Sequence, residues 1–389
     1  MIKREIEKIL PDLTNTYPVI TIIGPRQSGK TTLVRKFYSK YNYCNLEDPD
    51  VRSLALLDPR SFFRQYPPPV IIDEIQRVPH LLSYIQVMVD ESRQNGQFIL
   101  TGSQNLSLTA EISQSLAGRS ALVTLLPFTA KEVYKISKKK YTRDNLIYKG
   151  FLPRIYDQNQ NPTFAYRNYL QTYVERDVRQ LLNIKDLLIF EKFLRILAGR
   201  VSQLLNMSSL ASDTGVSVTT INNWLSILEA SFIIFRLPPF YQNIGKRLIK
   251  SPKIYFIETG LVTYLLDIEN EQQVRRDPLL GNLFENMIVA ELLKLRLNMG
   301  LDNNLLFYRD SQHNEVDILL KKGNNYIPVE IKAAESYHTD FEKNIRKFRD
   351  ATGQNNQGYI IYGGIHYFDT SENIRVCGID ELEKLILNQ

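Results

Sequence analysis

Apolar and polar positions follow one another along residues 19–127 in a pattern that predicts buried strands separated by helices. Short apolar runs lie at Val19–Ile23, Val70–Ile72 and Phe98–Leu100, and a further strand-like run spans Ala121–Leu126. Wholly apolar runs of this length are typical of central strands that are buried on both faces of a parallel sheet. The longer mixed stretches between them suit helices that cover those faces. We therefore expect an α/β fold built on a parallel sheet.

The first apolar run leads into residues 24–31, which read Gly-Pro-Arg-Gln-Ser-Gly-Lys-Thr and match the G-x-x-x-x-G-K-[ST] phosphate-binding loop. A strand before the loop and a helix after it would direct backbone N–H groups and the helix dipole at phosphate charge. Lys30 would reach the β- and γ-phosphates, and Thr31 would place its hydroxyl on Mg²⁺. The predicted cofactors are therefore ATP and Mg²⁺. The predicted nucleotide-binding residues are Gly24, Pro25, Arg26, Gln27, Ser28, Gly29, Lys30, Thr31 and Thr32.

Polar residues at the ends of the next strands complete the predicted nucleotide site. Asp73 and Glu74 follow the second apolar run, where ligands bind in parallel sheets. Asp73 would hold the Mg²⁺ shell, and Glu74 would act as the general base on water. Ser103 ends the third strand, where it would contact the γ-phosphate or its water, or form an ordinary loop and helix cap. Arg119 would stabilise transition-state charge in a neighbouring subunit, or serve as a cation at a helix end.

The middle of the chain has the spacing of a helix-turn-helix. Between residues 208 and 229, Ala211 is small where two helices approach, Gly215 marks the turn, and Ile221 and Trp224 are apolar positions of the second helix. Strand-like runs follow at 232–237 and 253–257, so the pattern predicts a winged-helix module. The basic residues expected to contact phosphate from its wing are Lys246, Arg247, Lys250 and Lys253. A module that only joins domains or subunits is the alternative.

The last hundred residues are predicted to order as helix, three strands, helix and strand. Glu330 and Lys332 lie two positions apart on one strand and would face the same side, with Asp317 on the strand beside them. Asp317 and Glu330 could thus form a second Mg²⁺ site, with Glu285 as a further acidic ligand. This layout resembles the PD-(D/E)xK phosphodiesterase core, although Val316 stands where that pattern often has proline.

The ordered set of motifs resembles a family of prokaryotic AAA+ ATPases that carry a C-terminal DUF4143 region. The motifs are GPRQSGKTT, VIIDEIQ, ILTGSQ, SLAGR, GFLP at 150–153, YLQTYVERD at 169–177, KIYFIETGL at 253–261, GNLFE at 281–285, EVD at 315–317 and VEIK at 329–332. The resemblance covers nearly the whole chain. It implies an AAA+ P-loop ATPase core at 1–128, a helical lid at 129–188, a winged-helix-like domain at 189–275 and a nuclease-like α/β domain of the restriction-endonuclease type at 276–389. It also implies a homo-oligomer, as in a hexameric ring.

Charge and composition indicate which partners the protein would bind and in which cellular compartment it would lie. Residues 131–255 hold 20 Lys and Arg against 9 Asp and Glu, whereas the remainder holds 28 against 33. A basic middle is expected to dock a polyanion such as DNA, and a solvated lysine-rich face is the alternative. Two cysteines form no disulfide framework, which favours a reducing compartment. With no signal-peptide core and no apolar run of membrane-spanning length, a cytoplasmic protein without a membrane partner is expected.

These features predict an ATP-hydrolysing enzyme that binds DNA through residues 131–255 and the C-terminal domain, and remodels or processes it. The first alternative is a nucleotide-gated interaction or signalling module whose nuclease-like domain is inactive. The second is a Mg²⁺-dependent nuclease licensed by ATP, in which Lys332 assists cleavage.

Overall fold

The computed structural model describes residues 2–103, 115–136, 141–172, 187–240 and 251–387. The chain divides into two compact units, one made of Met1–Phe128 with Ala230–Phe232 and Leu297–Leu301, and one made of the remaining residues. The predicted division of the second unit into lid, winged-helix and nuclease-like parts stays a prediction.

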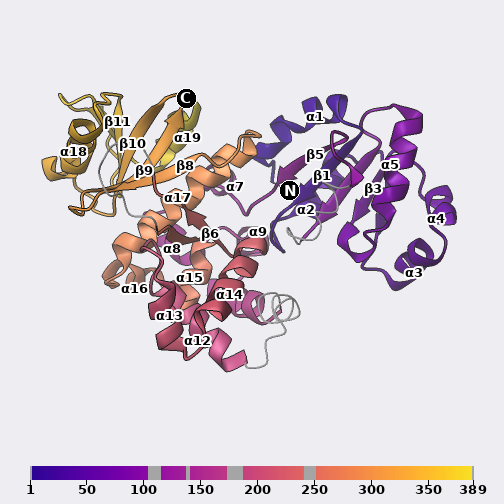
Figure 1. Ribbon diagram of the computed structural model, residues 1–389, viewed down its shortest axis with the longest axis horizontal. Coiled ribbons are helices and arrows are strands. Elements are labelled where there is room, and N and C mark those ends of the chain that lie inside the picture. Colours follow the sequence, from indigo (N-terminus) through magenta and orange to yellow (C-terminus); the bar gives the residue numbers. More distant parts are fainter. Residues whose placement is uncertain (1, 104–114, 137–140, 173–186, 241–250, 388–389) are drawn as a thin grey trace. The chain divides into compact units, whose positions relative to one another are not determined.

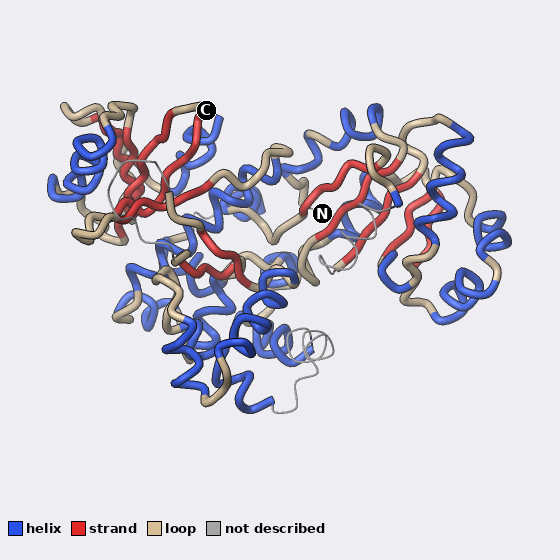
Figure 2. Tube along the Cα trace, viewed as in Figure 1, coloured by secondary structure: helices blue, strands red, loops and turns tan. Residues whose placement is uncertain are grey.

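The first unit is built on a five-stranded parallel sheet in the order β2-β3-β4-β1-β5 (Figures 1 and 2). The expected α/β fold with a parallel sheet core is confirmed. Every strand runs the same way, so the carboxyl ends of β1, β3 and β4 meet at one edge. That edge is where the predicted phosphate-binding and acidic residues lie in the sequence. The strands are β1 (Val19–Ile23), β2 (Asn42–Asn45), β3 (Val70–Asp73), β4 (Phe98–Gly102) and β5 (Ser120–Thr124).

Alternate residues of the central strands face two separate apolar cores. Val19 and Ile23 of β1 belong to one cluster, whereas Ile20 and Ile22 belong to the other. The strands are mainly apolar because helices cover both faces of the sheet, and the buried Thr21 of β1 shares a hydrogen bond with Ser120 of β5. The first cluster takes in residues of α3 (Pro49–Leu57), α4 (Pro59–Gln65) and α5 (Leu81–Ser92), and the second takes in residues of η1 (Glu5–Lys8), α1 (Leu10–Thr16) and α2 (Lys30–Phe37).

The predicted pair of helices in the middle of the chain is present. α13 (Met207–Thr214) ends at Gly215, whose φ of +78° is the left-handed conformation that closes a helix, and α14 (Val218–Ala230) follows. Ile221 is fully buried, and the Trp224 ring packs on Phe190 and Phe193 of α12 (Leu187–Ala198). The expected strands after the helices are β6 (Ile234–Leu237) and β7 (Lys253–Phe256), which pair antiparallel.

The second unit contains further short helices. They are α7 (Ala130–Ile136), α8 (Arg143–Lys149), α9 (Pro153–Asp157), α10 (Pro162–Tyr169), α15 (Thr259–Leu265) and α16 (Glu271–Arg276).

A buried carboxylate joins two motifs that lie more than one hundred residues apart. Glu258 Oε1 accepts hydrogen bonds from the Phe151 backbone N–H at 2.7 Å and from the Tyr166 hydroxyl at 2.9 Å. Gly150 lies against both groups, because a Cβ there would come within 2.1 Å of Glu258 Oε1 and of the Tyr166 hydroxyl oxygen. The GFLP and IETG motifs therefore form one structural lock.

The C-terminal region forms a six-stranded mixed sheet in the order β12-β13-β11-β10-β9-β8. The predicted order of helix, three strands, helix and strand is confirmed. Two strands at the far edge, β12 and β13, were not predicted. The elements are α17 (Leu280–Asn298), β8 (Leu305–Arg309), β9 (Glu315–Lys322), β10 (Asn325–Lys332), η4 (Thr339–Glu342), α18 (Lys343–Thr352), β11 (Gly358–Tyr362), β12 (Phe368–Asp369), β13 (Ile374–Cys377), η5 (Ile379–Glu381) and α19 (Leu382–Leu387).

Within the ranges given above, no helix is long and apolar enough to cross a bilayer. Cys44 and Cys377 are both free and buried.

The lock around Gly150 predicts a large loss of stability for Gly150→Ala. The added methyl meets two oxygens, and the φ of +61° disfavours any side chain, so the free energy of unfolding should fall by about 3 kcal/mol or more. Denaturant unfolding followed by circular dichroism measures the change. Gly353→Ala is the matched control, since its φ is +71° and a Cβ would meet nothing within 4 Å. That variant should lose only about 1 kcal/mol, and equal losses in the two variants would contradict the lock.

Candidate functional site

The phosphate-binding loop is held in a conformation that glycine alone allows at two positions. Gly24 has a φ of +152°, and a Cβ there would come within 2.1 Å of the Leu125 carbonyl oxygen. Gly29 has a φ of +93° and forms the N-cap of α2. The loop can therefore pass close to the end of β5 and then turn directly into the helix. The first N–H groups of α2 are left facing the loop, as phosphate binding requires.

Lys30 is the buried cation of the loop. Its ammonium donates hydrogen bonds to the carbonyl oxygens of Gly24 and Pro25, both at 2.9 Å, and the residue is 5% exposed. Burial lowers the pKa of Lys30 to about 8, against the opposing charges of Glu74 and Asp73. A phosphate bound at this position would favour the ammonium form, because its negative charge would offset the cost of burying the cation.

Asp73, at the end of β3, accepts hydrogen bonds from three hydroxyl groups. Thr31 Oγ1 donates to Oδ2 at 2.8 Å, the Tyr43 hydroxyl donates to the same oxygen at 3.0 Å, and Thr101 Oγ1 donates to Oδ1. The two residues predicted to hold Mg²⁺, Thr31 and Asp73, are thus in direct contact. Their hydroxyl and carboxylate oxygens are donors that Mg²⁺ prefers, so this pair fits the ion beside bound phosphates.

Glu74 lies next to that pair and is held by polar groups of its own. Its backbone has a φ of +60°, which is the left-handed region, and its N–H donates to Thr101 Oγ1 at 3.1 Å. Ser103 Oγ donates to the Glu74 carboxylate at 2.9 Å and 3.2 Å, and the Gln76 amide also donates to it. The structure therefore places predicted Ser103 on the predicted base. An outlying backbone angle of this kind is common at functional sites.

Of the remaining predicted nucleotide-binding residues, Arg26, Gln27 and Ser28 lie between β1 and α2, and Thr32 lies in α2. Ser28 is fully buried, and its Oγ has no hydrogen-bond partner among the described residues. An unpartnered buried hydroxyl in a phosphate loop fits a bound anion. Arg26 and Gln27 are half-buried and Thr32 is exposed.

Arg4 is a site residue that the sequence analysis missed. Its guanidinium donates to the Ser28 carbonyl oxygen at 2.7 Å and to the Leu126 carbonyl oxygen at 2.8 Å, and it lies 4.8 Å from the centre of the Phe128 ring. It therefore fastens the phosphate loop to the end of the ATPase sheet. No local signal marks this arginine, because Leu126 lies 122 residues away in the sequence.

Arg119 is held by a carboxylate of its own unit. Its Nε donates to Asp90 Oδ1 at 2.6 Å and its Nη2 donates to Asp90 Oδ2 at 2.9 Å, so the pair is bidentate. The side chain is one-third exposed. An action on a neighbouring subunit would require Arg119 to leave Asp90, and that role stays a prediction.

The residues predicted for a second cation site lie together in the C-terminal sheet. Lys332 Nζ donates to Glu330 Oε1 at 2.5 Å, and Asp317 Oδ2 accepts from the Ile331 backbone N–H at 2.7 Å. Burial, followed by the charge of Asp317, raises the pKa of Glu330 to about 8. In the described part of the chain, no group of three or more His, Cys, Asp and Glu side chains is arranged to hold a metal ion.

The prediction that Lys253 meets phosphate from an exposed wing is wrong. Lys253 is 2% exposed, and its ammonium lies 2.9 Å from Glu285 and 2.6 Å from Glu315. The sequence analysis grouped it with its basic neighbours Lys246, Arg247 and Lys250, which fall outside the described residues. The three consecutive lysines at 138–140 also fall outside them.

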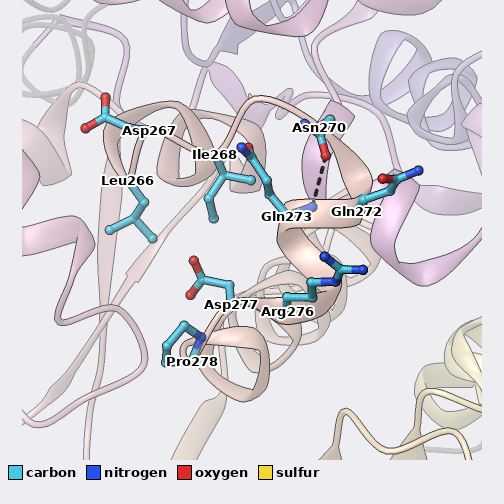
Figure 3. A pocket seen from close by; sticks show the side chains of 9 residues that line it. All are labelled: Leu266, Asp267, Ile268, Asn270, Gln272, Gln273, Arg276, Asp277 and Pro278. Atoms are coloured by element: carbon cyan, nitrogen blue, oxygen red, sulfur yellow. Dashed lines mark hydrogen bonds between the residues drawn. The ribbon is translucent and has the colours of Figure 1, made fainter.

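A shallow hollow of about 390 Å³ lies around α16 and is lined by residues 266–278. Figure 3 shows its polar groups, where Asn270 Oδ1 accepts from the Gln273 backbone N–H at 3.0 Å. This bond caps the N-terminus of the six-residue helix α16. The polar groups drawn there therefore serve the helix end, and we assign no ligand to the hollow.

Three family models match the chain. An AAA domain matches residues 16–134, a domain of unknown function (DUF8612) matches 140–272, and another domain of unknown function (DUF4143) matches 280–382. The uncharacterized protein Rv2008c of Mycobacterium tuberculosis is 31% identical over 370 residues, which cover 94% of this chain and 81% of that protein. The uncharacterized protein MJ1637 of Methanocaldococcus jannaschii is 23% identical over 343 residues, which cover 75% and 71%.

Two solved structures are similar to part of this chain. The Walker-type ATPase PABY2304 of Pyrococcus abyssi is 14% identical, with a TM-score of 0.47 over 68% of this chain and 96% of that one. AMPPCP-bound DnaA from Aquifex aeolicus is 15% identical, with a TM-score of 0.31 over 58% and 85%.

The lowered pKa of Lys30 predicts that nucleotide binding takes up a proton at alkaline pH. Above the pKa of about 8 the free lysine is largely neutral, and bound phosphate restores its proton, so affinity should weaken as pH rises through this value. Titration calorimetry with Mg²⁺ and ADP, in buffers of different ionisation enthalpy, should give roughly 0.7 proton at about pH 8.5 and roughly 0.1 at about pH 7.

The matched control for this measurement is Lys36→Met, on the same helix but partly exposed and paired with Glu7. It should keep the uptake of wild type. An uptake that does not change between the two pH values would show that the Lys30 ammonium is not depleted by burial.

Proposed function

This chain belongs to the same family as Rv2008c and carries an AAA ATPase domain followed by a DUF4143 domain; from that premise we propose that it hydrolyses ATP with Glu74 as the general base. The AAA domain match and the P-loop support ATP binding and hydrolysis. The observation that carries the finer proposal is the pairing of Glu74 with Ser103 beside the Thr31–Asp73 contact.

Each residue of the site has a separate task in this proposal. The loop N–H groups and Lys30 bind the β- and γ-phosphates, and Arg4 keeps the loop in its bound shape. Thr31 and Asp73 would hold Mg²⁺, which supplies charge neutralisation on the phosphates when bound. Glu74 orients a water molecule and accepts its proton, while Ser103 and Gln76 fix the carboxylate. A carboxylate that is already positioned loses little free energy to reorganisation during the reaction.

We expect Glu74→Gln to separate binding from hydrolysis. The amide keeps the shape of the side chain and cannot accept a proton, so the turnover number should fall by about a hundredfold or more while nucleotide affinity stays near wild type. Ser103→Ala should give a smaller loss of about tenfold, because the base remains but is less well oriented.

Phosphate release and fluorescent-nucleotide binding measure the two effects. Glu91→Gln, at an exposed position near the end of α5, is the control and should change neither. Hydrolysis that survives Glu74→Gln would remove Glu74 from the catalytic role.

The proposed partner is DNA, bound through residues 131–255 and the C-terminal domain. The support is the surplus of basic residues in that segment, 20 against 9. Several of them are neutralised internally, since Arg195, Arg200 and Arg236 pair with Asp267, Asp213 and Glu229. Contacts to phosphate would therefore fall to cations such as Arg154 and Lys192, and to the basic runs outside the described residues. In the same proposal, subunits associate in a ring and Arg119 serves a neighbour's site.

A DNA partner predicts that the ATPase rate rises severalfold with DNA and that this rise is lost as salt increases, because phosphate contacts release counterions. Single-stranded, duplex and branched DNA should be compared at low and moderate salt. Charge reversal at Lys138, Lys139 and Lys140 should weaken the response, whereas reversal of Lys40 and Arg60, which are exposed in the first unit, should not. A rate that is indifferent to every DNA form would contradict the DNA proposal and leave the ATPase proposal untouched.

The second candidate is a nucleotide-gated interaction module. It is favoured by the lysine that lies among the carboxylates of the C-terminal domain, because such a domain would recognise a partner without cutting nucleic acid. In this case nucleotide binding, and not turnover, would control the partner.

A further inference from the structure

Four carboxylates gather at the base of the C-terminal sheet. Glu285 comes from α17, Glu315 and Asp317 from β9, and Glu330 from β10. Their side chains are between 1% and 22% exposed. Like charges that are buried this closely require a cation or a proton among them.

Lys253 supplies that cation from outside the sheet. It begins β7, which belongs to a separate two-stranded sheet, and its side chain is 3% exposed. Its Nζ lies 2.9 Å from Glu285, 2.6 Å from Glu315 and 3.9 Å from Asp317.

Other protein groups donate to several oxygens of these carboxylates. The Tyr255 hydroxyl donates to Glu285 Oε1 at 2.6 Å, and the Ile331 N–H donates to Asp317 Oδ2 at 2.7 Å. Asn344 Nδ2 joins Lys332 on Glu330 Oε1, at 2.9 Å. Of these carboxylates, Glu330 keeps one buried oxygen, Oε2, without a hydrogen-bond partner in the described residues. A Mg²⁺ ion here would have to displace the protein donors on Glu285 Oε1, Asp317 Oδ2 and Glu330 Oε1, and would lie beside the Lys253 ammonium.

The residues present therefore do not fit the divalent cation that the resemblance to PD-(D/E)xK phosphodiesterases implies. We propose that the Lys253 ammonium takes the place of that cation, so that the C-terminal domain is compensated by an internal charge, is not a metal-dependent nuclease, and is held to β6–β7 by this lysine. The proposal concerns the second unit alone and does not depend on ATP hydrolysis.

In this arrangement Lys253 excludes a divalent ion and also has a structural role. An ammonium that is buried among carboxylates is stabilising only while its partners are in place, and removing it leaves uncompensated charge. Lys253 thus couples the position of β7 to the carboxylates of α17 and β9. A divalent ion could enter only if this strand moved away or if the lysine were replaced.

Manganese binding to the full chain tests the exclusion directly. Asp73→Asn removes the carboxylate of the nucleotide site, and the protein is kept free of nucleotide. Electron paramagnetic resonance then counts free Mn²⁺ with Asp317 intact and with Asp317→Asn added. The two proteins should bind equally little ion at micromolar concentration. One equivalent that disappears with Asp317→Asn would overturn the proposal, and it would do so whether or not any lysine variant folds.

Replacing Lys253 tests whether its ammonium stands where a divalent ion would otherwise bind. In the Asp73→Asn chain, Lys253→Met should lower the midpoint of thermal unfolding by about 5 °C or more, and millimolar Mn²⁺ should restore much of that loss. The restoration should vanish when Asp317→Asn is also present.

Lys321→Met is the control. Lys321 is exposed and lies on β9, the strand that carries Asp317, so this variant should change neither the midpoint nor its response to Mn²⁺. A Lys253→Met midpoint equal to that of the parent chain, or a loss that Mn²⁺ does not relieve, would contradict the replacement of a metal ion by this ammonium.

Discussion

The hydroxyl groups around Asp73 are the constraint on which the nucleotide site depends. Thr31 belongs to the helix after the phosphate loop, Tyr43 to β2 and Thr101 to β4, so a single carboxylate on β3 ties four elements together. The parallel order of the strands makes this possible, because their carboxyl ends meet at one edge. Thr101 also positions Glu74, because the Glu74 backbone N–H donates a hydrogen bond to Thr101 Oγ1. Asp73 and Glu74, the predicted acid pair, are therefore held in place by hydroxyl groups of the protein.

The second unit buries several carboxylates, which are paired with lysines or hydrogen-bond donors. Its buried carboxylates are neutralised by lysines: Lys253 and Lys332 lie within ion-pair distance of Glu285 and Glu330. Glu258 receives N–H and hydroxyl donors and locks the GFLP and IETG motifs. Buried charges of this kind constrain geometry more than they add stability, because desolvation offsets much of the attraction. The charge pattern in this unit therefore serves mainly to hold its segments in register.

Much of this structure follows from local patterns in the sequence. The apolar runs predicted the central strands because both faces of the sheet are covered, and the glycine spacing predicted the loop because only glycine fits beside Leu125. Two features could not be predicted. Arg4 acts on a carbonyl 122 residues away, and Lys253 pairs with a carboxylate 32 residues downstream. Neither contact leaves a periodic trace, and a lysine in a basic stretch suggests a phosphate ligand until its burial is known. Long-range polar contacts of this kind are set by the fold.

We propose that a water molecule oriented by Glu74 attacks ATP at this site. The most direct test of this proposal is the turnover of ATP with Mg²⁺ in ¹⁸O-labelled water, followed by mass analysis of the released phosphate. Many turnovers are expected, with one solvent oxygen in each phosphate. Phosphate that stays attached to the protein, or nucleotide that binds without being cleaved, would contradict it.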